Sequence, residues 1–332
     1  MPADYTTNQY GDITGTVAAT LEKQALKHAQ PHLVLSTGAK KMSLPKNDTK
    51  VLRCRRPIPF VAATTALTEG IVPNATELRY DQIDIPILQY GAYVTVTDQL
   101  VDLHTTPVLG DINKLNAEQA AKTKEALLWG QLRATTNVQY ANGVAGVSSV
   151  TQPLTLDEQR KAVRTLHRNK AMKFTSIVQG GVKENTFPIE AAFICFAHTD
   201  AEAAIRAMDG FVPVARYGSM KPIHAMELGS VDNVRYILSA DLYPQLAAGG
   251  ALGANIGSGS TDVYTSIFVG TEAYACMNLA GKGVYTPVVR SVGNPTDSDP
   301  LGQTGSVGWK MYSGELVLNT DWIVAVKHSV VA

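Results

Sequence analysis

The feature that most constrains this chain is a pair of β-like segments separated by a long stretch without regular patterning. Residues 50–56 are β-like and end at Pro57. Residues 82–97 begin with isoleucines at every other position, the period of a strand. The connection, residues 60–79, is rich in Thr and Ala. A compact domain rarely keeps a loop of about 20 residues without a functional reason. The sequence therefore predicts an extended hairpin that projects from the rest of the molecule.

A long helix is predicted after the hairpin. Thr106 and Pro107 suit the N-cap and the first helical position, and no further proline occurs before Arg133. Strong helix formers fill this stretch, namely Ala117, Ala120, Ala121, Ala126, Leu127, Leu128 and Leu132. At 1.5 Å per residue the helix would be about 40 Å long. That length is large for a helix confined to one globular domain.

The remaining chain alternates helix and strand patterns. Thr-x-x-Glu capping boxes beginning at Thr155 and Thr199 predict helices up to Lys173 and Gly210. Apolar segments predict strands at 191–197, 263–270 and 310–330, and the small residues of 246–260 predict a loop. Residues 1–46 have a low apolar density, which predicts an arm that packs poorly against its own subunit. The chain is therefore expected to be a mixed α+β protein.

Composition restricts the partners of this 332-residue chain. Its charged content is 17%, below the roughly 25% of ordinary soluble domains, so much neutral surface is exposed or is buried against partners. Lys+Arg and Asp+Glu both number 29, which argues against the bulk positive charge of a nucleic-acid binder. Three widely spaced cysteines predict a reduced, intracellular chain. No signal peptide and no membrane span are expected, because every apolar run is short.

The catalytic and ligand-binding motifs considered in the sequence predict no catalytic, cofactor or metal site. The HExxH, GxxxxGK[ST] and GxSxG motifs are absent. His28 and His32 have helical spacing but no third ligand nearby. Cys195 and His198 could form a nucleophile pair only if the thiol were exposed, and its apolar strand indicates a core position. Asp299, in a proline-flanked segment with Asp297, is expected to lie in a solvated turn rather than a calcium loop.

Charge is segregated along the first third of the chain. Residues 21–56 contain nine basic and two acidic residues, a net charge of +7, and residues 57–111 contain seven acidic and one basic, a net charge of −6. The two blocks could be solvated faces, or they could be complementary docking surfaces between subunits. On the second interpretation the candidate inter-subunit contacts are Arg53, Arg55, Arg56, Glu69, Glu77 and Asp81.

Several segments, in order, resemble the phage N4-type major capsid protein family. They are 53–57, 62–70, 89–98, Pro107-Val108-Leu109, Glu118-Gln119-Ala120-Ala121, 299–303, 308–310, 316–319 and 322–324. The resemblance covers roughly residues 48–330 and is weakest in 135–260. Their order and spacing are more specific than any one segment alone.

The resemblance implies the HK97-type capsid fold. Its parts would be an N-terminal arm at 1–46, an extended hairpin (the E-loop) at 47–98, a peripheral domain with the long spine helix at 99–150 and 295–332, and an axial domain at 151–294. The implied protein is a non-enzymatic structural subunit of a tailed-phage icosahedral shell, assembled as pentamers and hexamers. It would be made in the host cytoplasm and would end in the virion capsid.

The expected partners are copies of the chain itself, with a decoration protein and the portal as further candidates. The shell would enclose double-stranded DNA without sequence-specific binding. Two other functions compete with this one, a different virion component such as a decoration or scaffold protein, and a cytosolic enzyme. Scaffold proteins tend to be highly charged and helical, unlike this chain, and an enzyme would leave the projecting hairpin unexplained.

Overall fold

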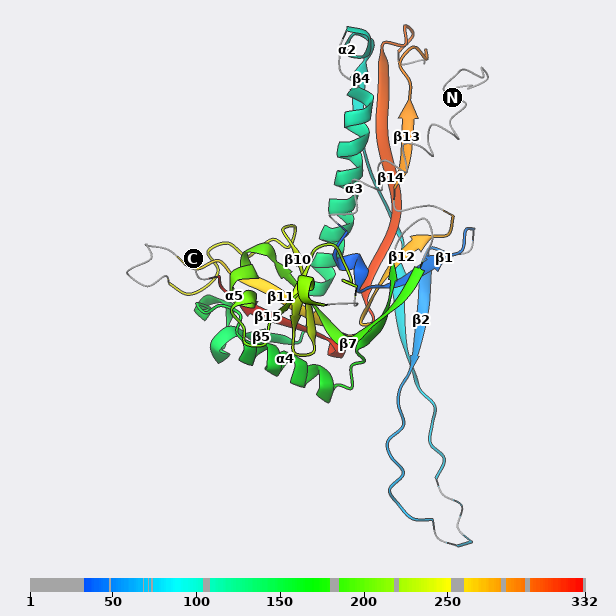
Figure 1. The fold of residues 1–332 in the computed structure, drawn as a ribbon. Helices are drawn as coiled ribbons and strands as arrows, with labels where there is room; N and C mark the ends of the chain where they lie inside the picture. Colours follow the sequence, from blue (N-terminus) through cyan, green and yellow to red (C-terminus); the bar gives the residue numbers. More distant parts are fainter. Residues whose placement is uncertain are drawn as a thin grey trace.

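A computed structural model describes residues 33–47, 49–67, 69–70, 72, 74–103, 108–179, 185–217, 221–251, 260–281, 285–295 and 299–330. Figure 1 shows a compact body from which two parts project in opposite directions, a long helix beside a sheet and a thin hairpin. The fold is mixed α+β, as predicted from the sequence.

The body is built on an eight-stranded sheet whose central strands contain continuous apolar runs, such as residues 191–197. Such runs suit strands that are buried on both faces. β7 lies between β10, to which it is parallel, and β11, to which it is antiparallel. The strands in order are β5 (Val138–Tyr140), β15 (Ile323–His328), β11 (Tyr264–Val269), β7 (Asn185–His198), β10 (Val234–Ser239), β9 (Glu227–Val231) and β8 (Val212–Pro213), and β6 (Phe174–Gln179) pairs with β7.

A second, long sheet extends away from the body beside the helix. Its strands are β1 (Lys40–Leu44), β12 (Tyr274–Leu279), β14 (Thr304–Val317) and β13 (Thr286–Arg290), and β4 (Leu88–Thr97) pairs along the other edge of β14. The helices are α2 (Asp98–Leu103), α3 (Val108–Arg133), α4 (Leu156–Arg168) and α5 (Glu202–Arg206), with single 3-10 turns at Leu35–Thr37, Ala141–Gly143, Val147–Ser149, Thr199–Ala201, Val214–Arg216 and Thr320–Trp322.

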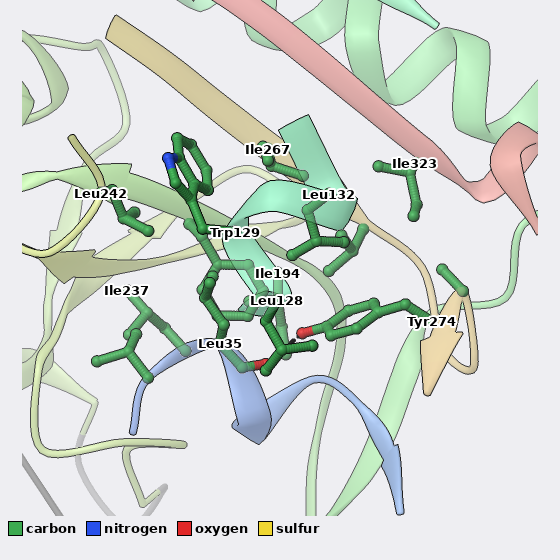
Figure 2. Close-up of a cluster of buried hydrophobic side chains, with 14 of the residues drawn as sticks. Leu35, Leu128, Trp129, Leu132, Ile194, Ile237, Leu242, Ile267, Tyr274 and Ile323 are labelled. Atoms are coloured by element: carbon green, nitrogen blue, oxygen red, sulfur yellow. Dashed lines mark hydrogen bonds between the residues drawn. The ribbon is translucent and has the colours of Figure 1, made fainter. Parts of the chain in front are cut away.

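The helix α3 joins the two sheets, and the predicted long helix is confirmed over Val108–Arg133. Its first half packs against the long sheet through Ala117 and Ala120, which contact a cluster containing Trp309. Its last turns enter the body, where Leu128 and Leu132 are buried in the largest apolar cluster (Figure 2). The helix is therefore long because it carries one apolar face across two separate cores. The predicted N-cap pair at 106–107 lies outside the described residues.

Residues 33–44, which lead into the long sheet, are packed more tightly than the predicted arm. Leu35 and Leu44 are buried, and β1 runs parallel to β12 in full register. The Tyr274 hydroxyl donates a hydrogen bond to the Leu35 carbonyl, seen at the lower edge of the cluster in Figure 2. The prediction is therefore wrong for residues 33–44, most of whose apolar side chains pack against other parts of the subunit. Residues 1–32 lie outside the described part of the chain.

The extended hairpin is confirmed, with β2 (Val51–Pro57) antiparallel to β3 (Tyr80–Pro86). The second segment, expected to be one strand, divides at Pro86. Its first part pairs with β2, whereas β4 pairs with β14 over ten residues. The hairpin is therefore joined to the long sheet directly, because β4 follows β3 after a single residue. Ile85 at its base is fully buried against Leu44 and Met277.

Both predicted capping boxes are wrong in detail. The Thr155 side chain makes no capping hydrogen bond, and Glu158 instead accepts one from the Asn142 backbone N–H at 3.0 Å. α4 ends at Arg168 rather than at residue 173. In the second box His198 takes the cap position, since its Nδ1 accepts from the Asp200 N–H at 3.1 Å. The first box is replaced by a contact with a distant residue and the second by a neighbouring side chain, so neither forms the pairing that the four-residue spacing suggests.

The two sheets do not divide the chain at the boundaries expected from the resemblance. β12 and β13 fall within the expected axial segment, but they pair with β14 in the long sheet. β15 falls within the expected peripheral segment, but it pairs with β11 in the body. The chain crosses between the sheets more often than a division by sequence ranges allows.

Candidate assembly surfaces

The hairpin loop exposes apolar side chains that no described part of the chain covers. Val61 is 92% exposed, Leu67 is 77% exposed and Phe60 is 60% exposed. Others of the same kind line both sides of the loop, namely Ile58, Val72, Leu78 and Tyr80. Figure 1 shows the loop extending well beyond the body. Contiguous exposed apolar surface of this kind marks an interaction site. Sequence analysis assigned this stretch to a loop and missed its apolar residues, although they can be read from the sequence.

The structure pairs several of the candidate contact residues within one hairpin. Arg53 donates two hydrogen bonds to Asp84, at 2.7 and 2.9 Å, and Arg56 donates one to Asp81 at 3.0 Å. Each pair lies directly opposite across β2 and β3. The hydrogen bond from Arg53 lowers the pKa of the Asp84 carboxyl, and the reciprocal bond raises the pKa of Arg53. The opposite charges of the two sequence blocks are therefore partly matched inside the subunit.

The other candidates are differently placed. Arg55 lies opposite Gln82, is exposed, and makes no ion pair among the described residues. Glu69 is exposed beside Gly70 near the turn of the loop. Glu77 pairs with its neighbour Arg79 at 2.8 Å. Arg55 and Glu69 are consequently the candidates that remain available to another subunit.

One face of the long sheet also exposes side chains that no described residue covers. Trp309 and Met311 of β14 point toward α3 and are buried. The alternate positions form the opposite face, where Tyr93 of β4 and Val288 of β13 flank Gly308 in register. Tyr93 is 73% exposed and Val288 is 43% exposed. A broad surface with exposed side chains, Lys310 among them, therefore lies along the projecting sheet.

A serine and a histidine meet inside the body, which sequence analysis did not foresee. The Ser266 hydroxyl lies 2.8 Å from His328 Nε2, and His328 Nδ1 lies 2.9 Å from the Ser329 carbonyl. The carbonyl only accepts, so Nδ1 carries the hydrogen and the serine donates to Nε2. Burial lowers the pKa of His328 to about 4. Both side chains are essentially fully buried, so the pair holds β11 to β15 and offers no access to a substrate.

The other residues considered as catalytic or metal-binding candidates have structural roles. Cys195 is completely buried in β7, and burial raises the pKa of its thiol well above the ordinary value. His198 contacts Asp200 rather than a thiol. Asp299 accepts hydrogen bonds from the backbone N–H groups of Gln303 and Thr304. Asp297 lies outside the described residues. In the described ranges no cluster of three or more His, Cys, Asp or Glu side chains could hold a metal ion.

Glu125 is a buried acid at the junction of α3 and the N-terminal segment. One carboxyl oxygen accepts a hydrogen bond from the Leu35 N–H at 2.8 Å, and the other has no partner in the described structure. Burial raises the pKa of Glu125 to about 8, so the carboxyl is largely protonated at neutral pH. Sequence patterns do not indicate this burial, because Glu is ordinarily an exposed helix residue.

Among the described residues, none of the helices combines the length and apolar character that a membrane crossing requires.

Comparison with known proteins agrees with this architecture. The profile of a family described as phage capsid protein matches residues 80–327. The major capsid protein of Pseudomonas phage KPP21 is 22% identical over 259 residues, which cover 72% of this chain and 65% of that relative. The chain thus spans just under two thirds of the length of the relative.

Solved capsids share the fold at low sequence identity. The capsid of Ralstonia phage GP4 superimposes with a TM-score of 0.67 at 11% identity, covering 89% of this chain and 87% of that one. A capsid chain of cyanophage Pam1 gives a TM-score of 0.62 at 13% identity, covering 91% and 92%. The projecting hairpin, the long helix beside its sheet and the α+β body are therefore the HK97-type capsid fold. The chain belongs to the phage capsid protein family, which is a family of structural proteins and not of enzymes.

Proposed function

We propose that this chain is the repeating subunit of a tailed-phage icosahedral shell and assembles as pentamers and hexamers. The observation that carries the proposal is the projecting hairpin, whose loop exposes Phe60, Val61 and Leu67 without cover from any described residue of the subunit. Exposed apolar area contributes to stability only after burial, at about 25 cal/mol per Å². A neighbouring copy is the partner that a repeating lattice supplies at every position.

The two sheets suggest how the subunit is divided in the shell. The long sheet with α3 corresponds to the peripheral domain, and it takes β1, β4, β12, β13 and β14. The eight-stranded body corresponds to the axial domain around the centre of each capsomer. The hairpin loop, residues 58–79, would reach over a neighbour. We propose this division in place of the sequence ranges expected from the resemblance alone.

The finer assignments, which are the N4-type branch, the place of synthesis and the further partners, rest on the sequence resemblance and on how tailed phages are assembled. The N4-type branch is supported by the ordered segments at 53–57, 89–98 and 299–303. The subunit would be made in the host cytoplasm, and the shell would enclose double-stranded DNA and carry a portal. A decoration protein could cover the uncovered face of the long sheet at Tyr93 and Val288.

Expression of the full chain tests the proposal. Sedimentation and negative-stain microscopy should show closed particles, hundreds of ångströms across, in equilibrium with capsomers. A decoration protein would instead stay small and bind only to shells built from another protein. A monodisperse small oligomer under all conditions of salt and concentration would refute the proposed assembly.

A further inference from the structure

A groove with a volume of about 400 Å³ lies between α4 and the edge strand β5. Lys161, Arg164 and Arg168 line it from the helix, and Gln139 and Tyr140 line it from the strand. The spacing of the three cations, three or four residues apart, places them on one face of α4. In Figure 1 this helix runs along the lower edge of the body, away from the free end of α3.

Among the described residues, no acidic side chain pairs with Arg164 or Arg168 in this groove. Glu158 also lines it, but its carboxylate already accepts the Asn142 N–H and lies 3.9 Å from Lys161. Arg164 and Arg168 are exposed and form no ion pair with any described residue. By contrast, the exposed Arg160 on the same helix pairs with Asp232 at 3.3 Å. Two arginines therefore remain free beside an open groove.

Positive charge continues beyond the groove on both sides. From residue 159 to residue 173 the sequence contains six Lys or Arg residues and no acidic residue. Next to β5, Lys327 lies in register with Tyr140. Burial and, to a lesser degree, the nearby charge of Arg133 lower the pKa of Lys327. In a chain with zero net charge, this edge of the body is a concentrated positive surface.

The chemistry of the surface distinguishes a polyanion from a protein partner. Protein interfaces have an apolar centre in which charged residues are depleted. None of the exposed large apolar side chains of the described chain lies between residues 116 and 171. Most of them lie on the hairpin loop, where contacts between copies are proposed, and on the long sheet with α2 and α3. The others are exposed elsewhere on the body, namely Met172, Val212, Met226, Tyr243 and Leu246. Val138 and Val144 also line the groove, but neither is among the exposed large apolar side chains. A surface with unpaired arginines and no exposed large apolar side chain suits a phosphate backbone, which Lys and Arg contact without reading sequence.

We infer that the groove between α4 and β5 binds the phosphate backbone of double-stranded DNA, so that this face of the subunit lines the inside of the shell. The inference rests on the proposed function, because only a shell subunit meets a genome on one face. Arg164 and Arg168 are the principal contacts. Lys161 contributes less because of its neighbour Glu158.

The test compares two double variants that lose the same charge. Arg164→Gln with Arg168→Gln removes the free arginines of the groove. Arg53→Gln with Arg56→Gln removes two hairpin arginines that are already paired with Asp84 and Asp81. Binding of the full chain to a short fluorescent DNA duplex is measured by anisotropy over a range of salt concentrations. Circular dichroism and sedimentation report folding and shell formation.

The groove variant should bind DNA about tenfold more weakly at 0.1 M salt, and the slope of log K against log salt should fall by about two. The hairpin variant should retain the slope of the unaltered chain. An unchanged slope in the groove variant would overturn the inference. A folded groove variant that binds DNA normally but forms no shells would assign the groove to contacts between copies. Failure of the unaltered chain to form shells would instead refute the proposed function, whatever the DNA result.

A second measurement covers the case in which the groove variant does not fold. Phenylglyoxal modifies accessible arginines, and mass spectrometry locates the modified residues. In the unaltered chain, added duplex DNA should protect Arg164 and Arg168 and should leave Arg160 and the hairpin arginines unprotected. Equal modification of the groove arginines with and without DNA would contradict the inference.

Discussion

In the body, the strands β7, β10 and β11 place almost every described side chain in a closed core, whereas the hairpin loop places Val61 and Leu67 in solvent. Both regions contain apolar residues. In the body these side chains pack against other residues of the same chain, whereas in the hairpin loop the described ones do not. The hairpin has one pair of strands, and an isolated two-stranded hairpin is marginally stable in water. Ile85 at its base is buried in the long-sheet core, whereas the described side chains of its far end, such as Val61 and Leu67, are exposed.

This difference separates two kinds of stability. The body should fold and persist as a single subunit, because its apolar clusters and the bond between Ser266 and His328 are complete. The hairpin loop should acquire its stability from a neighbour, because ordering a loop costs conformational entropy that its own contacts do not offset. Substitutions in the body should therefore change the subunit, and substitutions in the loop should change the shell.

The largest effect is expected from removing a core aromatic ring. Phe196→Ala deletes a fully buried side chain at the centre of the main cluster, and the cavity should reduce the free energy of unfolding by about 3–5 kcal/mol. Phe60→Ala, the matched change in the hairpin loop, should alter subunit stability by less than about 0.5 kcal/mol. Urea denaturation of unassembled subunits measures both. Similar losses for the two variants would mean that the loop packs within its own subunit.

An effect of similar size, but dependent on pH, is expected at Glu125. Its pKa is raised from 4.5 to about 8 by burial, so the folded subunit keeps a proton that the unfolded chain releases in this window. Stability should therefore fall as pH rises from 4.5 to 8, by roughly 1.4 kcal/mol per pH unit from this group. Glu125→Gln should remove that decline. Relative to the unaltered chain, the variant should therefore gain stability between pH 5 and pH 8.

Urea denaturation at several pH values measures the effect of Glu125→Gln. Glu118→Gln, on the same helix and half-buried, is the control and should leave the pH dependence in place. A parallel shift of the whole stability profile in the Glu125 variant, without a change of slope, would show that its ionisation is not coupled to folding.

Polar substitution of the loop should act on assembly alone. Phe60→Ser with Val61→Ser removes two exposed apolar side chains without touching β2 or β3, so the monomer should unfold as before. Particle yield in sedimentation should fall several-fold, since every interface of the shell repeats the lost contact. Tyr243→Ser, at an exposed position on the body, is the control. Full yield from the loop variant would show that the loop faces solvent in the shell.

The smallest effects are expected from the hairpin charges. The triple change of Arg53, Arg55 and Arg56 to Glu should lower assembly, and reversal of Glu69, Glu77 and Asp81 to Lys should partly restore it if the blocks meet between subunits. The ion pairs of Arg53 and Arg56 within the hairpin mean that Arg55→Glu alone is the cleaner test. Exposed pairs are individually weak, so salt should modulate the yield gradually. Equal yield for Arg55→Glu at low salt would leave the charges as a solvated face.

The sequence by itself determined the elements that depend on local pattern. The alternation at residues 82–87 specified a strand, and a proline-free run of helix formers specified α3 to its last residue. The absence of catalytic motifs and the ordered segments of the resemblance specified a structural family. These features are set by neighbours along the chain, and neighbours along the chain are what sequence patterns report.

Only the tertiary structure decided which sheet each strand joins and which polar groups meet. β12 and β15 are both short apolar strands, and nothing local distinguishes the sheet beside α3 from the sheet of the body. Arg164 remains free while Arg160 is paired because Asp232, 72 residues further along the chain, lies beside only one of them. Glu125 is buried because a segment 90 residues earlier packs over it. Contacts of this kind depend on the closing of long loops, and a linear pattern carries no record of them.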